Sequence, residues 1–397
     1  MAGRRKVVAL AGVLAAIVLA GPAGIGEAKE RTPRATHVPA TPENLTYGAL
    51  PRDASPVATV KSGGVAVVDT IGAVGGTSTV SPEQYFGAFG VRPDEILKDV
   101  KDFWASLPGR TRSGPHPLTG PIYVEGAEPG DVLQVDIIGL RTRVPYGVNL
   151  TAPFSGVLAP TYPGFRPGDL GLDIPEPPAD AIAGLFPNVR QHLIRTGLNR
   201  KGEEVAFFSK DVEVPLRKHL GVMGVAPADN MWVGSTPDAE PPADRMQGSG
   251  PPGPFGGNMD ISHLGEGWTL YLPVFRKGAQ FFAGDGHGAE GDGEVSGTAI
   301  EQSLTGTLRF TVRKDMELDL PRLENPRAWV VMGIDHDLDR AMRIAVLEAV
   351  EFLVEEKGMT PAKAYSLASV AVDFHSAEVV DGTQVVIGTI RKSLFKK

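Results

Sequence analysis

The run GDGHGAEGDGE, residues 284–294, concentrates acidic side chains and one imidazole among glycines. It places Asp285, His287, Glu290, Asp292 and Glu294 within eleven residues. Negative charges at this density repel one another unless a cation or a reacting group lies among them. Glycine has no β-carbon and lets the backbone turn tightly. The run is therefore typical of a chain that gathers ligands around a metal ion or a reacting centre.

Residues two apart on an extended chain project to the same face. Asp285 and His287 have this spacing, and so do Asp292 and Glu294, so the two pairs are predicted to meet around one ion or one substrate. Carboxylate oxygens with one imidazole suit zinc at a catalytic site, or a harder ion such as calcium or magnesium. The alternative is a solvated acidic turn. The apolar flanks AQFFAG and VSGTAI favour a semi-buried loop, in which unpaired carboxylates would be costly.

A second group of polar residues follows a glycine pair in GGNMDISHL. Asp260 is predicted as a metal ligand, with Asn258 orienting it or the substrate; the alternative is an Asx turn before a strand. His116, between two prolines in SGPHPLTGP, is either a ligand or a turn residue. His192 and His219 lie near basic residues and are expected at the surface.

Composition excludes several classes of site. The chain has no cysteine, which rules out disulfides, thiolate metal sites and cysteine nucleophiles. Its formal net charge is −8 and no basic stripe with interleaved aromatics is visible, so nucleic-acid binding is disfavoured. The sequence also lacks a Gly-x-Ser-x-Gly elbow, a phosphate loop and a dinucleotide fingerprint.

The N-terminus has the pattern of an export signal. Arg4, Arg5 and Lys6 precede an apolar run that is too short to span a membrane, and small residues lead to a cleavage site after Ala28. Residues 1–28 are therefore predicted to be a signal peptide, with the paired arginines permitting a twin-arginine route. We expect an exported protein, periplasmic or extracellular, with no stable membrane anchor after cleavage; the alternative is an uncleaved anchor.

The elements that must position these residues are mostly strands. Glycine and proline together make up about a fifth of the chain, which favours turns and short strands over helical bundles. Residues 29–57 are predicted to be an extended lead-in. Three segments, residues 56–71, 120–140 and 268–286, each have the pattern of a strand, a tight turn and a second strand.

Helices are fewer and lie mainly late in the chain. Residues 93–107 predict a short amphipathic helix capped by Asp94. A long helix is predicted over 335–358, followed by a helix in which Thr360 is the cap and Pro361 lies in the first turn. A final strand is expected near TQVVIGTIRK. The segments 150–190 and 234–257 are proline-rich and read as long surface loops.

The chain resembles the acetamidase/formamidase family. The likeness is carried by HVPATPEN, PVATVKSG, LTGPIYVEGAEPGDVLQVDI, PYGVNL, GVMGVAP and GGNMD, by the stretch LYLPVFRKGAQFFAGDGHGAEGDGEVSGTAIE, and by DLDRAMRIA. These segments span residues 37–390 in family order, and the GDGHGAEGDGEVSGTAIE portion is the most specific. The resemblance implies a catalytic domain over 58–397, built of sandwich-like β-sheets with an added α+β portion whose C-terminal helical segment covers 335–369.

The resemblance also implies function. Members are amidases that hydrolyse the carbon–nitrogen bond of a small amide of the formamide or acetamide type, and they are metal-associated homo-oligomers. Matched residue by residue, the implied metal ligands are Asp260, Asp285, His287 and His116, with zinc favoured and calcium as the alternative. His116 is the reserve ligand, the acid–base residue is either Glu294 or Asp292, and the implied substrate-binding residues are Tyr146, Asn149 and Asn258.

Three parts of the sequence depart from the family pattern. Thr46 and Tyr47 stand where a histidine–tryptophan pair is common, and Gly63-Gly64 stands where a glycine–aspartate turn is expected. Glu290 stands where an uncharged residue is usual. A changed substrate or a lost activity would follow if the missing histidine contacts metal or substrate. The alternative function is therefore a secreted calcium-holding binding or structural protein with the same fold and no amidase activity.

Overall fold

The computed structural model describes residues 35–110, 112–151, 156–157, 190–244 and 246–396. The predicted signal peptide and most of the predicted loop 150–190 lie outside these residues. The described chain is mostly β with a long C-terminal helix, so the predicted fold class is confirmed. None of the described helices has the length and apolar character needed to cross a bilayer.

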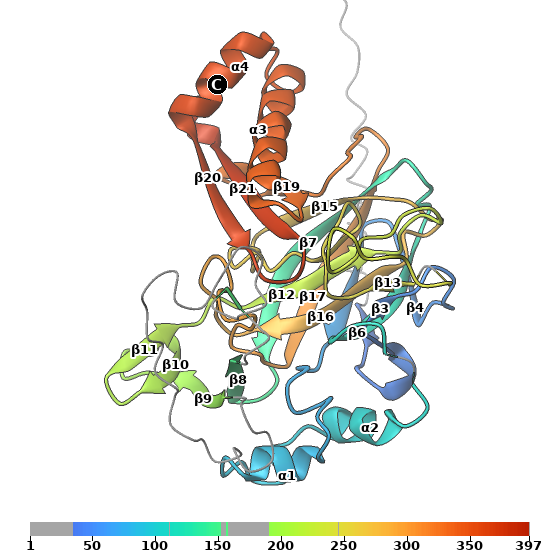
Figure 1. The fold of residues 1–397 in the computed structure, drawn as a ribbon, viewed down its shortest axis with the longest axis vertical. Helices are drawn as coiled ribbons and strands as arrows, with labels where there is room; N and C mark the ends of the chain where they lie inside the picture. The colour runs from blue at the N-terminus through green and yellow to red at the C-terminus, as the bar shows by residue number, and fades with distance from the viewer. Residues whose placement is uncertain (1–34, 111, 152–155, 158–189, 245, 397) are drawn as a thin grey trace, which may run out of the picture. The chain divides into compact units, whose positions relative to one another are not determined.

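The largest sheet among the described residues has nine strands (Figure 1). Their order across the sheet is β1 (Thr36–Val38), β5 (Gly64–Asp69), β17 (Leu304–Arg313), β7 (Val132–Thr142), β15 (Thr269–Pro273), β18 (Arg322–Glu324), β19 (Ala328–Asp335), β21 (Gln384–Arg391) and β20 (Val372–Glu378). β1 pairs with β5 in parallel, and the other neighbours are antiparallel.

A second sheet of six strands carries most of the candidate site. Its order is β14 (Gly256–Asn258), β12 (His219–Val225), β16 (Phe281–His287), β6 (Pro117–Glu125) and β2 (Leu45–Tyr47), with β4 (Ala58–Lys61) paired in parallel with β6. Buried side chains of both sheets, such as Val135 of β7 and Phe281 of β16, belong to one hydrophobic cluster. The two sheets therefore pack together as a sandwich.

The remaining strands form two smaller sheets. One contains β11 (Val212–Pro215), β10 (Glu204–Ser209), β9 (Arg190–Leu198) and β8 (Tyr146–Thr151), and the other pairs β13 (Gln247–Gly248) with β3 (Ala49–Leu50). Two short 3-10 turns, η1 (Pro42–Asn44) and η2 (Lys392–Leu394), complete the strand-rich part. β1, β2 and β3 lie in the described part of the predicted lead-in and pair within the sheets.

The three predicted strand–turn–strand segments are strands, but their pairing differs from a hairpin. β4 and β5 lie in different sheets, and so do β6 and β7 and also β15 and β16. Each turn carries the chain from one layer of the sandwich to the other. The predicted pairing of β4 with β5 is therefore wrong, because alternation shows that a segment is extended without showing which strand it faces.

The helices cover opposite ends of the sheets. Figure 1 shows α1 (Pro82–Gly87) and α2 (Lys98–Ser106) far from α3 (Leu338–Glu355) and α4 (Pro361–Ala371), and α3 packs on β19 and β21. The Asp337 side chain caps α3 by accepting from the Arg340 amide at 2.8 Å. The N-cap of α2 is Leu97, three residues after the predicted cap Asp94, because the Arg92 amide donates to the Glu95 carboxylate and closes a separate turn there.

A half-buried carboxylate on α3 makes stability depend on pH. Burial, with help from Glu351, raises the pKa of Glu348 from 4.5 to about 7, although Arg322 opposes the shift. Because the pKa of Glu348 is raised in the folded state, the protonated side chain contributes its full stability below pH 4.5. This contribution is lost as the pH rises through 7. At pH 8, Glu348→Gln should therefore have a higher urea midpoint than wild type. Its free energy of unfolding should be larger by about 1–2 kcal/mol after allowance for solvent screening.

The same substitution should leave the urea midpoint at pH 3 nearly unchanged, since Glu348 is then protonated in both the folded and the unfolded state. Glu125→Gln, which replaces an exposed carboxylate at the end of β6, serves as the control and should change neither midpoint. An equal gain for Glu348→Gln at both pH values would show that packing, and not ionisation, causes it.

Candidate metal centre

The candidate site lies at one end of the six-stranded sheet, where β16 and β12 run antiparallel. β16 ends with Asp285 and His287, and His219 at the start of β12 is in register with His287. Asp260 is the second residue after β14, and His116 immediately precedes β6. Sheet pairing thus brings together residues that are far apart in the sequence.

His287 is the centre of this group and is fully buried. Its Nε2 atom lies 3.2 Å from Asp285 Oδ2 and 3.4 Å from Glu301 Oε1. Its Nδ1 atom lies 3.0 Å from Glu290 Oε2 and 3.8 Å from Asp260 Oδ1. One imidazole therefore has carboxylates on both of its nitrogen atoms.

Two further histidines are oriented by backbone carbonyls. His116 Nδ1 lies 3.1 Å from the Ser249 carbonyl oxygen, and His219 Nδ1 lies 2.9 Å from the Arg217 carbonyl oxygen. In each case Nδ1–H donates to the carbonyl, which leaves Nε2 to face the centre of the group. His116 Nε2 lies 3.7 Å from Asp285 Oδ2. This arrangement is the usual way in which proteins prepare imidazoles for metal binding.

Charge is unevenly distributed among the carboxylates. Burial alone would raise the pKa of Asp285, but the charges of His116 and His287 hold it well below its ordinary value. Burial and the charge of Asp285 raise the pKa of Glu301 to about 7, although His287 opposes the shift. Burial and the charge of Glu294 raise the pKa of Asp260 well above its ordinary value. The group therefore holds more carboxylates than its histidines can neutralise.

Several buried polar atoms of the group have no hydrogen-bond partner among the described residues. They are both carboxylate oxygens of Asp260, Oδ1 of Asp285, Nε2 of His287 and Oε1 of Glu290. Unpartnered buried polar atoms are rare in folded proteins and costly. A divalent cation would satisfy them and would offset the surplus negative charge, so the residues present fit a metal ion.

Gly221 on β12 leaves the space that these side chains fill. A β-carbon at Gly221 would lie 2.2 Å from Asp260 Oδ1, 2.6 Å from Asp285 Oδ2 and 2.9 Å from His287 Cε1. These are distances at which atoms overlap. The three side chains therefore converge over the backbone of one glycine. The sequence of β12, which is apolar on both faces, gives no sign of this convergence.

Three carboxylate residues of the group have left-handed backbone conformations. The φ angles are +41° for Asp260, +53° for Asp285 and +44° for Glu294. Such angles are uncommon outside glycine and persist where the surrounding structure imposes them, often at functional sites. Backbone strain at these three positions indicates that the fold holds their side chains toward one point.

A cavity of about 490 Å³ opens onto this group. The polar residues that line it include His116, Asn258, Asp285, Glu294, Glu301 and Asp381. The Asn258 amide donates to Asp381, and its own side-chain oxygen is buried without a partner among the described residues. Thr46 and Tyr47, which depart from the family pattern, are not among the described residues lining the cavity.

The structure separates the pair Asp292 and Glu294. Glu294 is buried beside His287 and Asp260, whereas the Asp292 side chain is 37% exposed and contacts Ser262. Alternation fails here because Gly293 and Glu294 both have positive φ angles, so the chain turns between the two carboxylates. The predicted meeting of the Asp292–Glu294 pair around one ion is therefore not observed.

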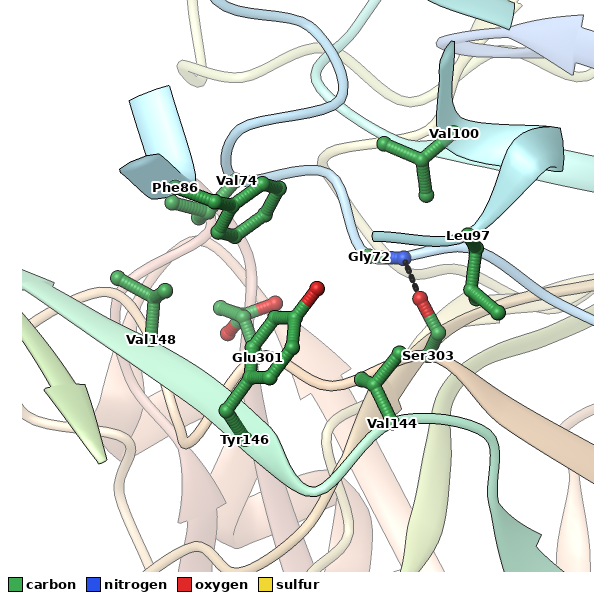
Figure 2. Close-up of a pocket in the computed structure, with 10 residues that line it drawn as sticks. All are labelled: Gly72, Val74, Phe86, Leu97, Val100, Val144, Tyr146, Val148, Glu301 and Ser303. Atoms are coloured by element: carbon green, nitrogen blue, oxygen red, sulfur yellow. Dashed lines mark hydrogen bonds between the residues drawn. The ribbon is translucent and has the colours of Figure 1, made fainter. Parts of the chain in front are cut away.

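Tyr146 and Asn149 lie on β8 and do not line the cavity of about 490 Å³. Figure 2 shows Tyr146 among the side chains around a small cavity of about 20 Å³ that Glu301 also lines. Its hydroxyl donates to the Glu95 carbonyl at 3.3 Å, and burial raises its pKa to about 12. Asn149 donates to the carbonyl oxygens of Thr298 and Ala299, at 2.9 and 3.1 Å, and so supports the chain just before Glu301.

Three residues of the site, His219, Glu301 and Asp381, were not predicted from the sequence. His219 was expected at the surface, but it is fully buried, so that expectation is wrong. The local sequence does predict burial of His219. The segment HLGVMGV after Lys218 contains no other charged or polar side chain, as is typical of a strand buried on both faces. Glu301 lies within the most specific family segment. Asp381 comes from the β20–β21 connection, which no local pattern relates to the site.

Comparisons with known proteins agree with the resemblance. The model of the Acetamidase/Formamidase family matches residues 110–245 and 238–396. A formamidase from Methylophilus methylotrophus is 27% identical over 314 residues, which cover 67% of this chain and 73% of that protein. An acetamidase from Mycolicibacterium smegmatis is 27% identical over 317 residues, covering 63% of this chain and 71% of that one.

Solved structures show the same fold. The crystal structure of an acetamidase from Yersinia enterocolitica superposes with a TM-score of 0.68 at 26% identity, covering 93% of this chain and 95% of that one. An acetamidase from Bacillus halodurans gives a TM-score of 0.66 at 24% identity, covering 90% and 98%.

Proposed function

The chain belongs to the acetamidase/formamidase family and is an amidase, and from this premise we propose that it cleaves the carbon–nitrogen bond of a short aliphatic amide in a metal-dependent reaction. The observation that carries the proposal is the convergence of Asp260, Asp285 and His287 over Gly221, where Asp285 also lines a cavity of about 490 Å³.

The same three side chains would hold the metal ion, with His116 beside them. Imidazole nitrogen together with carboxylate oxygen favours zinc over calcium, which prefers oxygen ligands alone. A zinc ion bound there would polarise the amide carbonyl and make a water molecule more acidic. The unpartnered oxygens of Asp260 and Asp285 support this assignment.

Asn258 is suited to orient a primary amide. Its side-chain nitrogen donates to Asp381, so the side chain is fixed. Its buried oxygen then remains free to accept an N–H of the substrate, since the described residues give it no other donor. An ester or acid of the same size would lack that N–H, and the site would bind it less tightly.

Glu294 is the acid–base residue in this proposal. It would accept a proton from water as the water oxygen bonds to the carbonyl carbon. It would then give that proton to nitrogen as the carbon–nitrogen bond breaks, which releases a carboxylic acid and ammonia. Burial and the charge of Asp381 raise the pKa of Glu294, and a raised pKa makes its carboxylate a stronger base than an exposed glutamate.

The test measures ammonia release from formamide, acetamide and propionamide by the purified protein, with and without a chelator. We expect release that the chelator lowers at least about tenfold and that added zinc, but not calcium, restores. Release that resists metal removal would contradict the metal-dependent part alone. No release by folded, zinc-loaded protein would contradict the substrate assignment.

Export is a further part of the proposal, and it rests on Arg4, Arg5, Lys6 and the apolar run after them. N-terminal sequencing of protein recovered from the cell envelope or medium should find a chain that starts after Ala28. An intact N-terminus on protein confined to the cytoplasm would contradict export without affecting the amidase assignment.

A further inference from the structure

Asp292 belongs to a second cluster outside the candidate metal centre. The cluster, hereafter the outer cluster, consists of His263, Asp292 and His375, whose ligand atoms lie within 4.8 Å of one another. His263 follows β14, Asp292 lies in the loop after β16, and His375 lies on the edge strand β20. Three distant segments therefore meet through side chains that commonly bind metals.

The distances in the outer cluster are those of ligands around an ion and not of good hydrogen bonds. His263 Nε2 lies 3.5 Å from Asp292 Oδ1, and His375 Nε2 lies 3.6 Å from Asp292 Oδ2. Hydrogen bonds of this type are usually about 2.7–3.2 Å long. Ligand atoms bound tetrahedrally to zinc at about 2.0–2.1 Å lie roughly 3.3 Å apart. The spacing thus leaves room for a cation between the three groups.

The orientation of the side chains supports the same reading. The two imidazole rings are nearly perpendicular, with an interplanar angle of 87° and centroids 6.0 Å apart, so they do not stack. His375 Nε2 is inaccessible to solvent and has no hydrogen-bond partner among the described residues. Ser262 Oγ donates to Asp292 Oδ1 at 2.7 Å and fixes the carboxylate. Fixed carboxylates of this kind orient metal ligands.

We propose that the outer cluster is a second metal site, which binds a divalent transition cation such as Zn²⁺ through His263, Asp292 and His375. Two imidazoles and one carboxylate suit zinc, nickel or copper and do not suit calcium or magnesium. Their exposed fractions, 41%, 37% and 35%, leave room for water as a further ligand and for entry of the ion.

Binding there would hold the loop that carries the inner carboxylates. Asp292 lies between Glu290 and Glu294, whose side chains are buried at the candidate metal centre. The adjacent Gly293 amide already donates to the Ala377 carbonyl of β20 at 2.7 Å. A cation in the outer cluster would add a second tie between this loop and β20.

The test is metal stoichiometry of the full protein. Metal-free protein is dialysed against excess Zn²⁺ at micromolar concentration, and bound zinc is counted by elemental analysis. The double variant His263→Gln/His375→Gln should bind one equivalent less than wild type, whatever the occupancy of the inner site. Removing outer-shell partners alone costs about 10–100-fold in metal affinity, so loss of two direct ligands should cost more than about 100-fold.

Two controls separate this outcome from general damage. His192→Gln replaces an exposed histidine on β9 whose ring contacts Phe208, and it should retain the wild-type stoichiometry. The double variant should unfold at the same temperature as metal-free wild type. Equal zinc stoichiometry and affinity in wild type and the double variant would overturn the proposal, as would restoration of the missing equivalent by Ca²⁺ in the double variant.

Discussion

Replacing Asp285 with asparagine is expected to lower kcat/KM for the best amide at least about a thousandfold. Asparagine keeps the shape of the side chain but removes the charge that faces His287 at 3.2 Å and His116 at 3.7 Å. It also replaces one buried acceptor by a donor that would point at those cationic or metal-binding groups. If the ion supplies several kcal/mol, its loss corresponds to about three powers of ten in rate.

Bound metal should be lost from the Asp285→Asn variant in parallel with its activity. The two measurements are steady-state ammonia release and elemental analysis of protein purified with zinc. Asp211→Asn, at an exposed turn between β10 and β11, is the control and should match wild type in both. Full activity in Asp285→Asn would remove Asp285 from the mechanism.

The second large effect is expected from Glu294→Gln. Glutamine cannot carry the proton from water to the leaving nitrogen, so kcat should fall by about 10²–10⁴. KM should change little, because the amide would still bind at Asn258. Zinc content should also be retained, since Asp260, Asp285 and His287 remain. Loss of zinc together with loss of activity would instead identify Glu294 as a metal ligand.

Asp292→Asn is the matched comparison for Glu294→Gln, because both carboxylates lie in the same short glycine-rich run. The Asp292 side chain points away from the buried group, so kcat should stay within about tenfold of wild type. A larger loss in Asp292→Asn than in Glu294→Gln would exchange the roles of the two residues.

The sequence predicted the site best within a strand of the sheet. Asp285 and His287, two residues apart on β16, lie 3.2 Å apart as predicted, although Asp285 itself has a φ angle of +53°. The prediction failed for Asp292 and Glu294, which lie in the loop after β16, where positive φ angles at Gly293 and Glu294 turn the chain. Alternation applies within strands, and glycine-rich loops are where it ends.

Residues supplied by pairing could not be predicted from local pattern. His219 reaches His287 because β12 and β16 are neighbours in register, and Asp381 reaches Asn258 from 123 positions away. The extended segments and the long helix were predictable from periodicity. The choice of sheet for each strand was not, since it depends on which long-range contacts bury the most apolar surface. The family resemblance supplied the family and the amidase activity, which periodicity could not, and the family match confirms both.

The order of the strands in the nine-stranded sheet sets the time at which the enzyme can first become active. β5 pairs with β17, whose residues are about 240 positions later in the chain, and Thr305 donates to Asp69 across a separation of 236. The sandwich therefore cannot close until most of the polypeptide has left the ribosome. Contacts of such long range slow folding, because a large loop must be ordered before they form. Asp381 lies still later, so shortened chains that lack the β20–β21 hairpin would fold around an incomplete cavity.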